Sequence, residues 1–307
     1  MADQLVSATP AAEAQPVPPS TAAMQPPVRP DNFRRVWRRF RRRPLPMTGL
    51  VLVVAFLLVA IVGPLLTTDP TANNFDQVLS PSSITNPLGT DDLGRDVLAR
   101  IASGARTSLL AGVLSTLLAM VVGIPLGLVT GFYRRWLDPV VMRLVDVVQA
   151  FPSLVVAVGL AAILGPSLRN VVLALAISQV PAVVRITRGE VFGVREMDFV
   201  AGAIADGAGD GVILLRYVLP NISNALIVQA TVAIPTAIIG EATLSFLGLG
   251  VQPPTPSWGV MLNSAQQFLS QAPWLAIWPG LMIALATLGF NLFGDGLRDV
   301  LDPRSAR

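Results

Sequence analysis

Six long apolar segments recur along the chain, and shorter polar stretches separate them. Each segment approaches or exceeds the ~20 residues that an α-helix needs to cross ~30 Å of hydrocarbon at ~1.5 Å per residue. The pattern therefore predicts an all-α integral membrane protein with about six transmembrane helices. The predicted spans cover residues 47–66, 107–132, 140–164, 168–187, 223–247 and 274–293.

Proline interrupts the second to the fifth of these predicted spans, at Pro125, Pro152, Pro181 and Pro235. A proline removes one backbone donor from a helix. In a membrane bundle, neighbouring helices can satisfy the carbonyl groups that this leaves free. We therefore expect a kink at each proline rather than a break in the helix.

Composition agrees with a membrane protein. Of the 307 residues, 52% are hydrophobic and 13% are charged, and the mean hydropathy is +0.62. Soluble domains average roughly 25% charged residues. The chain has too little polar surface to cover a soluble globule of this size.

Missing residue types exclude several kinds of chemistry. The sequence contains no Cys and no His, and every one of its 22 basic residues is Arg. These absences exclude Cys/His zinc sites, a Cys nucleophile and a Ser-His-Asp triad. Without Lys there is no P-loop, whose lysine reaches the nucleotide phosphates. If the protein uses ATP, another chain must bind it.

The arginines are unevenly distributed around the apolar segments. With the N-terminus inside the cell, only four of the 22 fall in outer segments: Arg95, Arg100, Arg106 and Arg169. The positive-inside rule therefore predicts that both termini are cytoplasmic. The isoelectric point of about 10.4 reflects these flanking arginines, so we expect contact with the bilayer and not with nucleic acid.

Composition divides the chain into three regions. Residues 1–33 are rich in Pro, Ala and Gln, which predicts a disordered cytoplasmic tail. Residues 34–106 comprise a basic interfacial segment, the first transmembrane helix and an external segment. The arginine-rich stretch at 32–43 predicts a helix on an anionic membrane surface, or a positive flank that orients the first span. Residues 107–307 form a core with five transmembrane helices and a cytoplasmic loop at about 188–220.

Three glycines follow one another at intervals of four residues in the second predicted span, at Gly123, Gly127 and Gly131. This spacing places them on one side of a helix. Small residues in one line let two membrane helices approach closely. The pattern predicts a helix-packing face without chemistry of its own.

Four polar residues inside the apolar spans are candidates for the translocation path or a gate: Asp146, Gln149, Gln229 and Glu241. Polar and charged groups are costly in hydrocarbon, so they face the bundle, water or one another. Asp146 lies one turn after Arg143, and we favour an ion pair between these two residues. For Glu241, a structural hydrogen bond and a gating role are both open.

The inner segment 198–220 has an unusual sequence for a connecting loop. A short run of small and apolar residues precedes Gly207 and Gly209, and a second stretch ends at Leu219 and Pro220. The pattern predicts a short helix, a glycine turn and a second helix that leads into the fifth span. Such a helix could fit a groove of a partner domain, or it could simply join two spans.

This segment resembles the cytoplasmic loop of the membrane subunits of ATP-binding-cassette importers. That loop carries Glu-Ala-Ala, then three residues and Gly, and further on Ile-x-Leu-Pro. Here Ala201-Gly202-Ala203 occupies the Glu-Ala-Ala position, Gly207 the Gly, and 217–220 the end of the motif. The Glu and one Ala are absent.

In that family the loop forms the coupling helix that docks into the ATPase subunit. The resemblance therefore implies an ATPase-coupling role for this part of the chain. The implied residues are Asp198, Phe199, Val200, Ala201, Gly202, Ala203, Ala205, Asp206, Gly207, Ala208, Leu219 and Pro220.

Further segments resemble one subfamily, the C-type permease subunits of dipeptide and oligopeptide importers. The similar segments are 86–109, 150–154, 185–190 and 244–250, and the resemblance extends over roughly residues 36–303. It implies a type I importer permease fold in the bacterial plasma membrane. Importers of nickel, glutathione and other small solutes have similar subunits, so the substrate stays open.

The resemblance also implies a set of partners. These are a homologous second permease subunit, two cytoplasmic ATPase subunits that carry ATP and Mg²⁺, and an external substrate-binding protein. It implies no cofactor on this chain and no enzymatic activity of its own.

Two alternatives of other classes are weighed against the importer. A secondary transporter would use an ion gradient, but such proteins often contain inverted repeats, and the sequence shows no convincing internal repeat. A non-transporting assembly or sensor subunit would bind ATPases without stimulating uptake.

Overall fold

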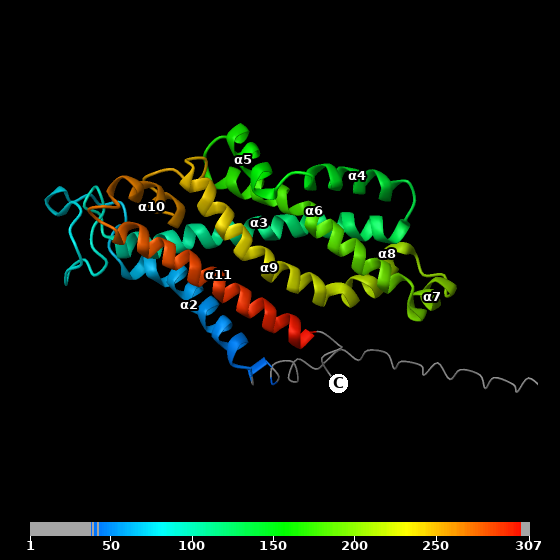
Figure 1. Cartoon of the computed structure of the whole chain (residues 1–307). Helices are drawn as coiled ribbons and strands as arrows, with labels where there is room; N and C mark the ends of the chain where they lie inside the picture. The colour runs from blue at the N-terminus through cyan, green and yellow to red at the C-terminus, as the bar shows by residue number, and fades with distance from the viewer. Residues whose placement is uncertain (1–37, 39, 42, 302–307) are drawn as a thin grey trace, which may run out of the picture.

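The computed structural model describes residues 38, 40, 41 and 43–301. Helices dominate the described chain, as predicted (Figure 1). Five of them are long and apolar enough to cross a membrane, and a bent pair of helices adds a sixth span if its halves are counted together. The five are α2 (Pro44–Leu66), α3 (Val97–Tyr133), α6 (Leu168–Arg195), α9 (Leu219–Phe246), which continues the helical stretch from Asp210, and α11 (Trp274–Leu301).

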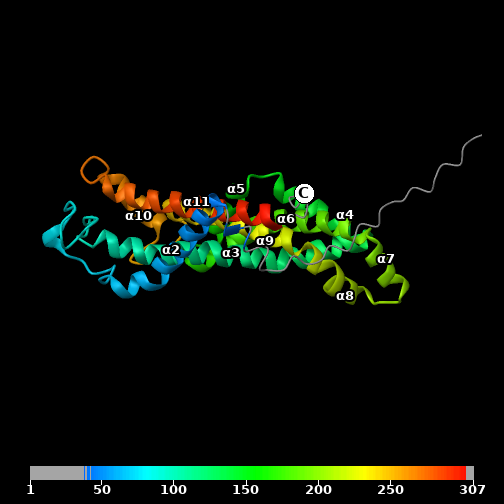
Figure 2. The same cartoon turned by 90° about the horizontal axis from the view of Figure 1, so that it is seen from below.

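The described chain is elongated, and its two ends carry different elements (Figures 1 and 2). At one end lie the segment 67–96 and α10 (Trp258–Ala265). At the opposite end lie α7 (Asp198–Ala205) and α8 (Asp210–Val212). The other short elements are η1 (Phe75–Gln77), η2 (Ile213–Val218) and η3 (Gln266–Phe268). The predicted tail, residues 1–33, lies outside the described residues.

The third predicted span is broken rather than kinked. α4 (Leu137–Gln149) and α5 (Ser153–Leu164) meet at an angle of 87°. Pro152 is the N-cap of α5. A proline ring drives the preceding residue out of the helical conformation, so the expectation of a kink is wrong here. The other three prolines lie inside continuous helices, as predicted: Pro125, Pro181 and Pro235.

The second span begins earlier than the predicted residue 107. The side chain of Asp96 accepts hydrogen bonds from the backbone N–H groups of Leu98 and Ala99, and this N-cap starts α3 at Val97. The arginines in this stretch favoured an external loop. Arg100, however, is buried, with 2% of its surface exposed.

A buried ion network explains how arginine is tolerated there. Arg95 Nε donates to Asp91 Oδ2 at 2.7 Å, and Arg100 Nε lies 3.3 Å from the same oxygen. Arg100 Nη1 donates to the carbonyl oxygen of Pro70 at 3.2 Å. Buried charges require such partners. The network ties the segment 67–96 to the first turn of α3.

α3 and α6 approach each other along the predicted glycine row. A Cβ atom added at any of the three glycines would overlap a Cβ atom of α6. The pairs are Gly123 with Val183 at 2.7 Å, Gly127 with Thr187 at 2.5 Å, and Gly131 with Val191 at 2.7 Å. Both helices advance by four residues per pair, so the backbones stay close over three successive contacts.

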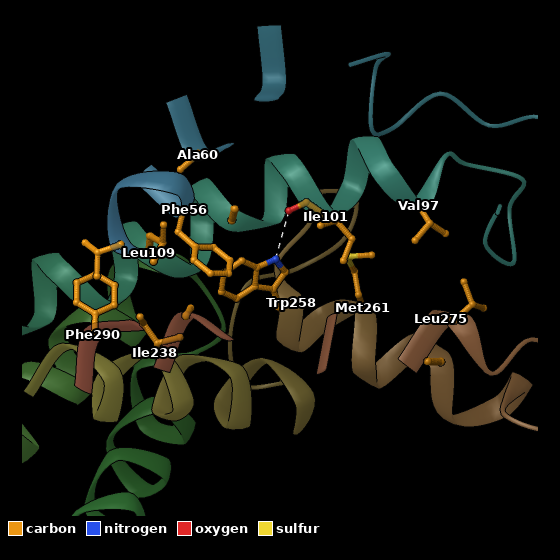
Figure 3. Packing of buried hydrophobic residues seen from close by; sticks show 14 of the residues in the cluster. Phe56, Ala60, Val97, Ile101, Leu109, Ile238, Trp258, Met261, Leu275 and Phe290 are labelled. Atoms are coloured by element: carbon orange, nitrogen blue, oxygen red, sulfur yellow. Dashed lines mark hydrogen bonds between the residues drawn. The ribbon is translucent and has the colours of Figure 1, made fainter. Parts of the chain in front are cut away.

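An apolar cluster around Trp258 stabilises the end of the bundle that carries α10 (Figure 3). The indole Nε1 donates to the carbonyl oxygen of Ile101 on α3 at 3.2 Å. Phe56 of α2 meets the indole edge-on, with ring centroids 5.8 Å apart. Phe290 and Leu275 of α11 belong to the same cluster. α10 is therefore anchored against three long helices.

We predict that Gly127→Leu lowers the free energy of unfolding by about 1–3 kcal/mol, the usual cost of overpacking a close contact. The added side chain would meet Thr187 and the carbonyl oxygen of Val184, which lies 2.9 Å from the new Cβ. Denaturant unfolding of the protein in detergent micelles measures the change. Gly159→Leu is the control, because its Cβ would meet no atom within 4 Å. Equal stability of the two variants would show that α3 and α6 are not tightly packed along the glycine row.

Candidate functional site

The short helix α7 ends in a glycine turn, as the sequence predicts. Gly207 has φ = +78°, a conformation that favours glycine. Its N–H donates to the carbonyl oxygen of Ile204 at 3.0 Å, and the N–H of Ala208 donates to that of Ala203 at 3.0 Å. This pair of bonds is the Schellman motif. The chain then enters α8, η2 and α9, so the predicted sequence of elements is confirmed.

One side of α7 is anchored to the bundle. Val200 is fully buried and Ala203 is 6% exposed. They belong to an apolar cluster that includes Val191 of α6 together with Ile213 and Val218 of η2. Because these contacts come from two long helical stretches, the position of α7 follows the positions of α6 and α9.

The other side of α7 is exposed and mostly small. Phe199 and Ile204 border it, with 40% and 52% of their surfaces exposed. A Cβ added at Gly202 would meet no atom within 4 Å. The exposed residues between these borders and at the ends of the helix are Asp198, Ala201, Gly202, Ala205 and Asp206. Together with Phe199 and Ile204 they form what we call the α7 outer face.

Charged groups brace the base of α7. Arg134 at the end of α3 pairs with Glu196 at 3.1 Å, just before α7 begins. The guanidinium carbons of Arg134 and Arg188 lie 4.2 and 4.3 Å from the ring centre of Phe192. Such cation–π contacts add to the ion pair. The ends of α3 and α6 are thus joined just before α7 begins.

Two further ion pairs attach α4 to α6. Arg188 donates two hydrogen bonds to Asp138, at 2.5 and 2.7 Å. Arg185 Nη2 donates to Asp146 Oδ1 at 2.6 Å. The favoured pairing of Asp146 with Arg143 is therefore wrong, because α4 lies beside α6 and a guanidinium from that helix reaches the carboxylate instead.

Leu219 and Pro220, at the end of the loop motif, start α9. Leu219 packs against the apolar cluster beneath α7, and Pro220 is exposed. Residues 213–218, directly before them, form a π-helical turn. Such irregular turns fit a place where proline removes a backbone donor.

Glu241 is fully buried near the end of α9. The hydroxyl of Ser245 donates to its Oε1 at 2.7 Å, and the hydroxyls of Ser108 and Ser257 approach the same carboxyl. Oε2 has no hydrogen bond of ordinary geometry within the described chain. Ser245 also accepts the N–H of Val251 at 3.1 Å. The cluster joins α9 to α3 and to the segment before α10.

The other candidate path residues lie elsewhere. Gln229 is partly buried on α9, ~18 Å along the helix from Glu241 at ~1.5 Å per residue. Asp146 and Gln149 are exposed on α4 near the helix break. The four residues therefore do not form one cluster.

Sequence reasoning missed a largely apolar cavity between α5, α6 and α9. It has a volume of about 130 Å³, and its polar lining residues are Ser153, Ser178, Gln179 and Thr236. Gln179 lies inside the predicted fourth span and carries the same signal that singled out Gln149. Among the residues that the structure describes, no group of three or more acidic side chains could hold a metal ion.

Two protein-family descriptions match the chain. "Binding-protein-dependent transport system inner membrane component" matches residues 123–307. "N-terminal TM domain of oligopeptide transport permease C" matches residues 32–81. The first match includes the whole segment from α4 to α11, with α7 and its glycine turn.

Curated relatives align over most of their own length. The dipeptide transport system permease protein of Alkalihalophilus pseudofirmus is 44% identical over 89% of this chain and 90% of its own. The di/tripeptide transport system permease protein of Pseudomonas aeruginosa is 43% identical over 90% and 94%. The glutathione transport system permease protein of Escherichia coli is 42% identical over 90% and 93%.

The long apolar helices and these matches agree with each other. The chain is a multi-pass protein of the bacterial inner membrane, and it belongs to the binding-protein-dependent transport system inner membrane components, the permease subunits of ATP-binding-cassette importers.

Proposed function

We propose that this permease subunit forms half of a translocation path for dipeptides or oligopeptides. The observation that carries the proposal is the identity of 44% and 43% to two permeases named for dipeptide and di/tripeptide transport, over about nine-tenths of each chain. The match at residues 32–81 to an oligopeptide permease domain supports the same substrate class.

Glutathione is a second candidate substrate. A permease named for glutathione transport is 42% identical to this chain. Glutathione is itself a tripeptide, so both candidates share the peptide group. Selectivity between them would depend largely on the external binding protein.

The partners follow from the proposed role. A second, homologous permease completes the path, two ATPase subunits bind ATP and Mg²⁺ on the cytoplasmic side, and an external binding protein delivers the substrate. The family description, which names dependence on a binding protein, supports the last partner. This chain has no lysine with which to build a P-loop.

The α7 outer face is the proposed contact with an ATPase subunit. Its small residues allow α7 to enter a groove of the ATPase subunit. Phe199 and Ile204 supply apolar surface at the borders of the α7 outer face. The motif glutamate is absent from this face, so apolar packing replaces an ion pair there. Because α7 packs against α6 and η2, movement of the ATPase would be transmitted to α6 and to α9, which continues from η2.

The orientation of the chain in the membrane is also part of the proposal. Arg134 caps the end of α3, and Arg185 and Arg188 lie in the second half of α6, the helix that leads into α7. Arginine gathers on the cytoplasmic side of membrane proteins. We infer that α7 and both termini face the cytoplasm.

Glu241 has a structural role in this proposal rather than a gating role. It is fully buried, and its hydrogen-bond partner and neighbouring hydroxyls come from segments at the outer end. Asp146 and Gln149, beside the break between α4 and α5, remain proposed residues of the translocation path. Gln229 lies on α9, as Glu241 does, but closer to the cytoplasmic side in this proposal.

Uptake by the purified assembly tests the proposed function. The two permeases and two ATPases are reconstituted in proteoliposomes with the binding protein, and a labelled dipeptide is supplied. We expect accumulation that requires ATP hydrolysis. Peptide accumulation driven by an ion gradient without ATP would instead indicate a secondary transporter, and ATPase binding without any uptake would indicate a non-transporting subunit.

We predict that Gly202→Trp reduces peptide-stimulated ATP hydrolysis at least tenfold, because the indole would occupy the space into which the ATPase docks; a tenfold loss of affinity corresponds to ~1.4 kcal/mol. The variant should keep wild-type thermal stability, since a side chain there meets no atom of this chain within 4 Å. Gly202→Ala is the matched control and should behave as wild type. Normal coupling in the tryptophan variant would remove α7 from the interface.

We predict that Glu241→Ala lowers the free energy of unfolding by about 1–3 kcal/mol, because it leaves buried hydroxyls without their acceptor. Glu241→Gln keeps an acceptor oxygen for Ser245 and should retain ATP-driven uptake. Unfolding and uptake are measured on both variants. Loss of uptake in a stably folded glutamine variant would show that the ionised carboxyl takes part in gating.

A further inference from the structure

The ion pair between Asp146 of α4 and Arg185 of α6 is open to its surroundings. Their side chains are 58% and 50% exposed. A single hydrogen bond joins them, from Arg185 Nη2 to Asp146 Oδ1. A guanidinium has five N–H donors and a carboxylate has about four acceptor positions. Most of the hydrogen-bonding capacity of both groups is therefore unused within the described chain.

The second ion pair between α4 and α6 is closed. Arg188 donates two hydrogen bonds to Asp138, and their side chains are only 26% and 14% exposed. Two parallel bonds of this kind fix the geometry of a pair as well as its charge. The closed pair already attaches α4 to α6, so attachment alone does not explain why Asp146 and Arg185 stay open.

The open pair lies at a depth where exposed charge is costly. Thr187, two residues after Arg185, packs against Gly127 of α3. Gly127 lies ~9 Å along α3 from its end at Tyr133, at ~1.5 Å per residue, and arginines that mark the inner surface follow Tyr133 directly. Charged groups at such a depth do not face hydrocarbon. This side of the chain therefore meets water or another protein.

A third charge and open space lie beside the pair. Arg143 is three residues before Asp146, so their side chains are neighbours on α4. It is exposed, and it has no ion-pair or hydrogen-bond partner within the described residues. Gly189, one turn after Arg185, is exposed too, and a Cβ added there would meet no atom within 4 Å. Two guanidiniums and one carboxylate give this group a net positive charge.

A short peptide has matching charges, whatever its side chains are. It ends in an ammonium group and a carboxylate. Guanidiniums bind carboxylates through short, charge-assisted hydrogen bonds, and a carboxylate binds an ammonium group in the same way. Because the three side chains carry an excess of positive charge, the carboxylate end of a peptide is the end that they attract from a distance.

We propose that Arg143, Asp146 and Arg185 form a binding site for the charged ends of the translocated peptide. Arg143 and Arg185 bind its carboxylate, and Asp146 binds its ammonium group. The proposal rests on peptide import as the function. Without substrate, Asp146 and Arg185 satisfy each other in part, which lowers the cost of keeping both charges within the membrane.

Charged thiol reagents test the site, because the chain has no cysteine. Gly189→Cys places one thiol beside the three charges. Leu58→Cys is the control, on the exposed apolar surface of α2 and on the far side of the bundle from α4 (Figure 1). Each variant is assembled with its partners in detergent. Labelling of this chain by an anionic and by a cationic thiosulfonate is measured, and each rate is divided by the rate of the same reagent with a free thiol.

We expect the thiol at position 189 to react with both reagents and to prefer the anionic one. Arg143→Gln in the same background should reduce this preference, and Asp146→Asn should increase it. Saturating dipeptide, supplied with the binding protein and ATP, should slow the reaction. The thiol at position 58 should stay unreactive. A thiol at position 189 that is equally unreactive, shows no charge preference or is not slowed by dipeptide would overturn the site.

Uptake tests the role of Arg143 in transport. Arg143→Gln should lower uptake of a labelled dipeptide about tenfold at saturating binding protein, because one charge-assisted hydrogen bond is lost. Arg143→Lys keeps the charge and should retain most of the uptake, which a merely structural role would not require. Arg135→Gln is the matched control, because Arg135 is an exposed arginine in the turn after α3, and it should import as wild type does.

The two assays separate the site from the proposed function. Wild-type uptake by Arg143→Gln would refute the role of Arg143 in binding the substrate. A wild-type assembly that imports no dipeptide would refute peptide import itself, whereas the charge preference at position 189 would still be measured.

Discussion

A bilayer offers no hydrogen bonds to an exposed peptide group, so a helix can be interrupted in it only where protein or water covers the break. Within the described residues, the five helices that are long and apolar enough to cross a membrane have no sharp break, and the sixth span is broken between α4 and α5. Around that break, ion pairs from α6 hold α4, and a largely apolar cavity lies beside the first turn of α5. Ion pairs with α6 therefore hold the helix before the break, and Asp146 and Gln149 lie beside it.

α6 connects these parts. Toward its end beside α7 it carries Arg185 and Arg188, which hold α4, and Val191, which packs beneath α7. Near the middle of its length it contributes Gln179 to the lining of the cavity between α5, α6 and α9. Along its length it packs against the glycine row of α3, where any added Cβ would clash. Close-packed contacts of this kind transmit strain, so a displacement of α7 would be passed on to α6.

Periodicity and composition predict much of this molecule because each predicted feature is local. Long apolar runs specify membrane helices, and glycines at intervals of four specify a close contact, whichever helix is the partner. The glycine turn at Gly207 is local too, since positive φ is a property of one residue.

What the sequence alone could not predict depends on residues far apart in the chain. The partner of Asp146 is Arg185 and not the neighbouring Arg143, because the packing of α4 beside α6 decides it. Arg100 favoured an external loop, yet Asp91 and Pro70 satisfy it inside the protein. The cavity between α5, α6 and α9 could not be predicted for the same reason. Gln179 can be recognised in the sequence as a polar residue in a span, but only the tertiary packing brings it near the start of α5.

The central claim is that a separate ATPase presses on α7. Because the chain has no native cysteine, Ala205→Cys places a single thiol on the α7 outer face, and a short bifunctional reagent can report what lies against it in the assembled importer. The account predicts a crosslink to an ATPase subunit whose yield changes when ATP is added. A thiol at position 205 that never crosslinks to an ATPase and instead reacts with an impermeant reagent from outside the cell would contradict it.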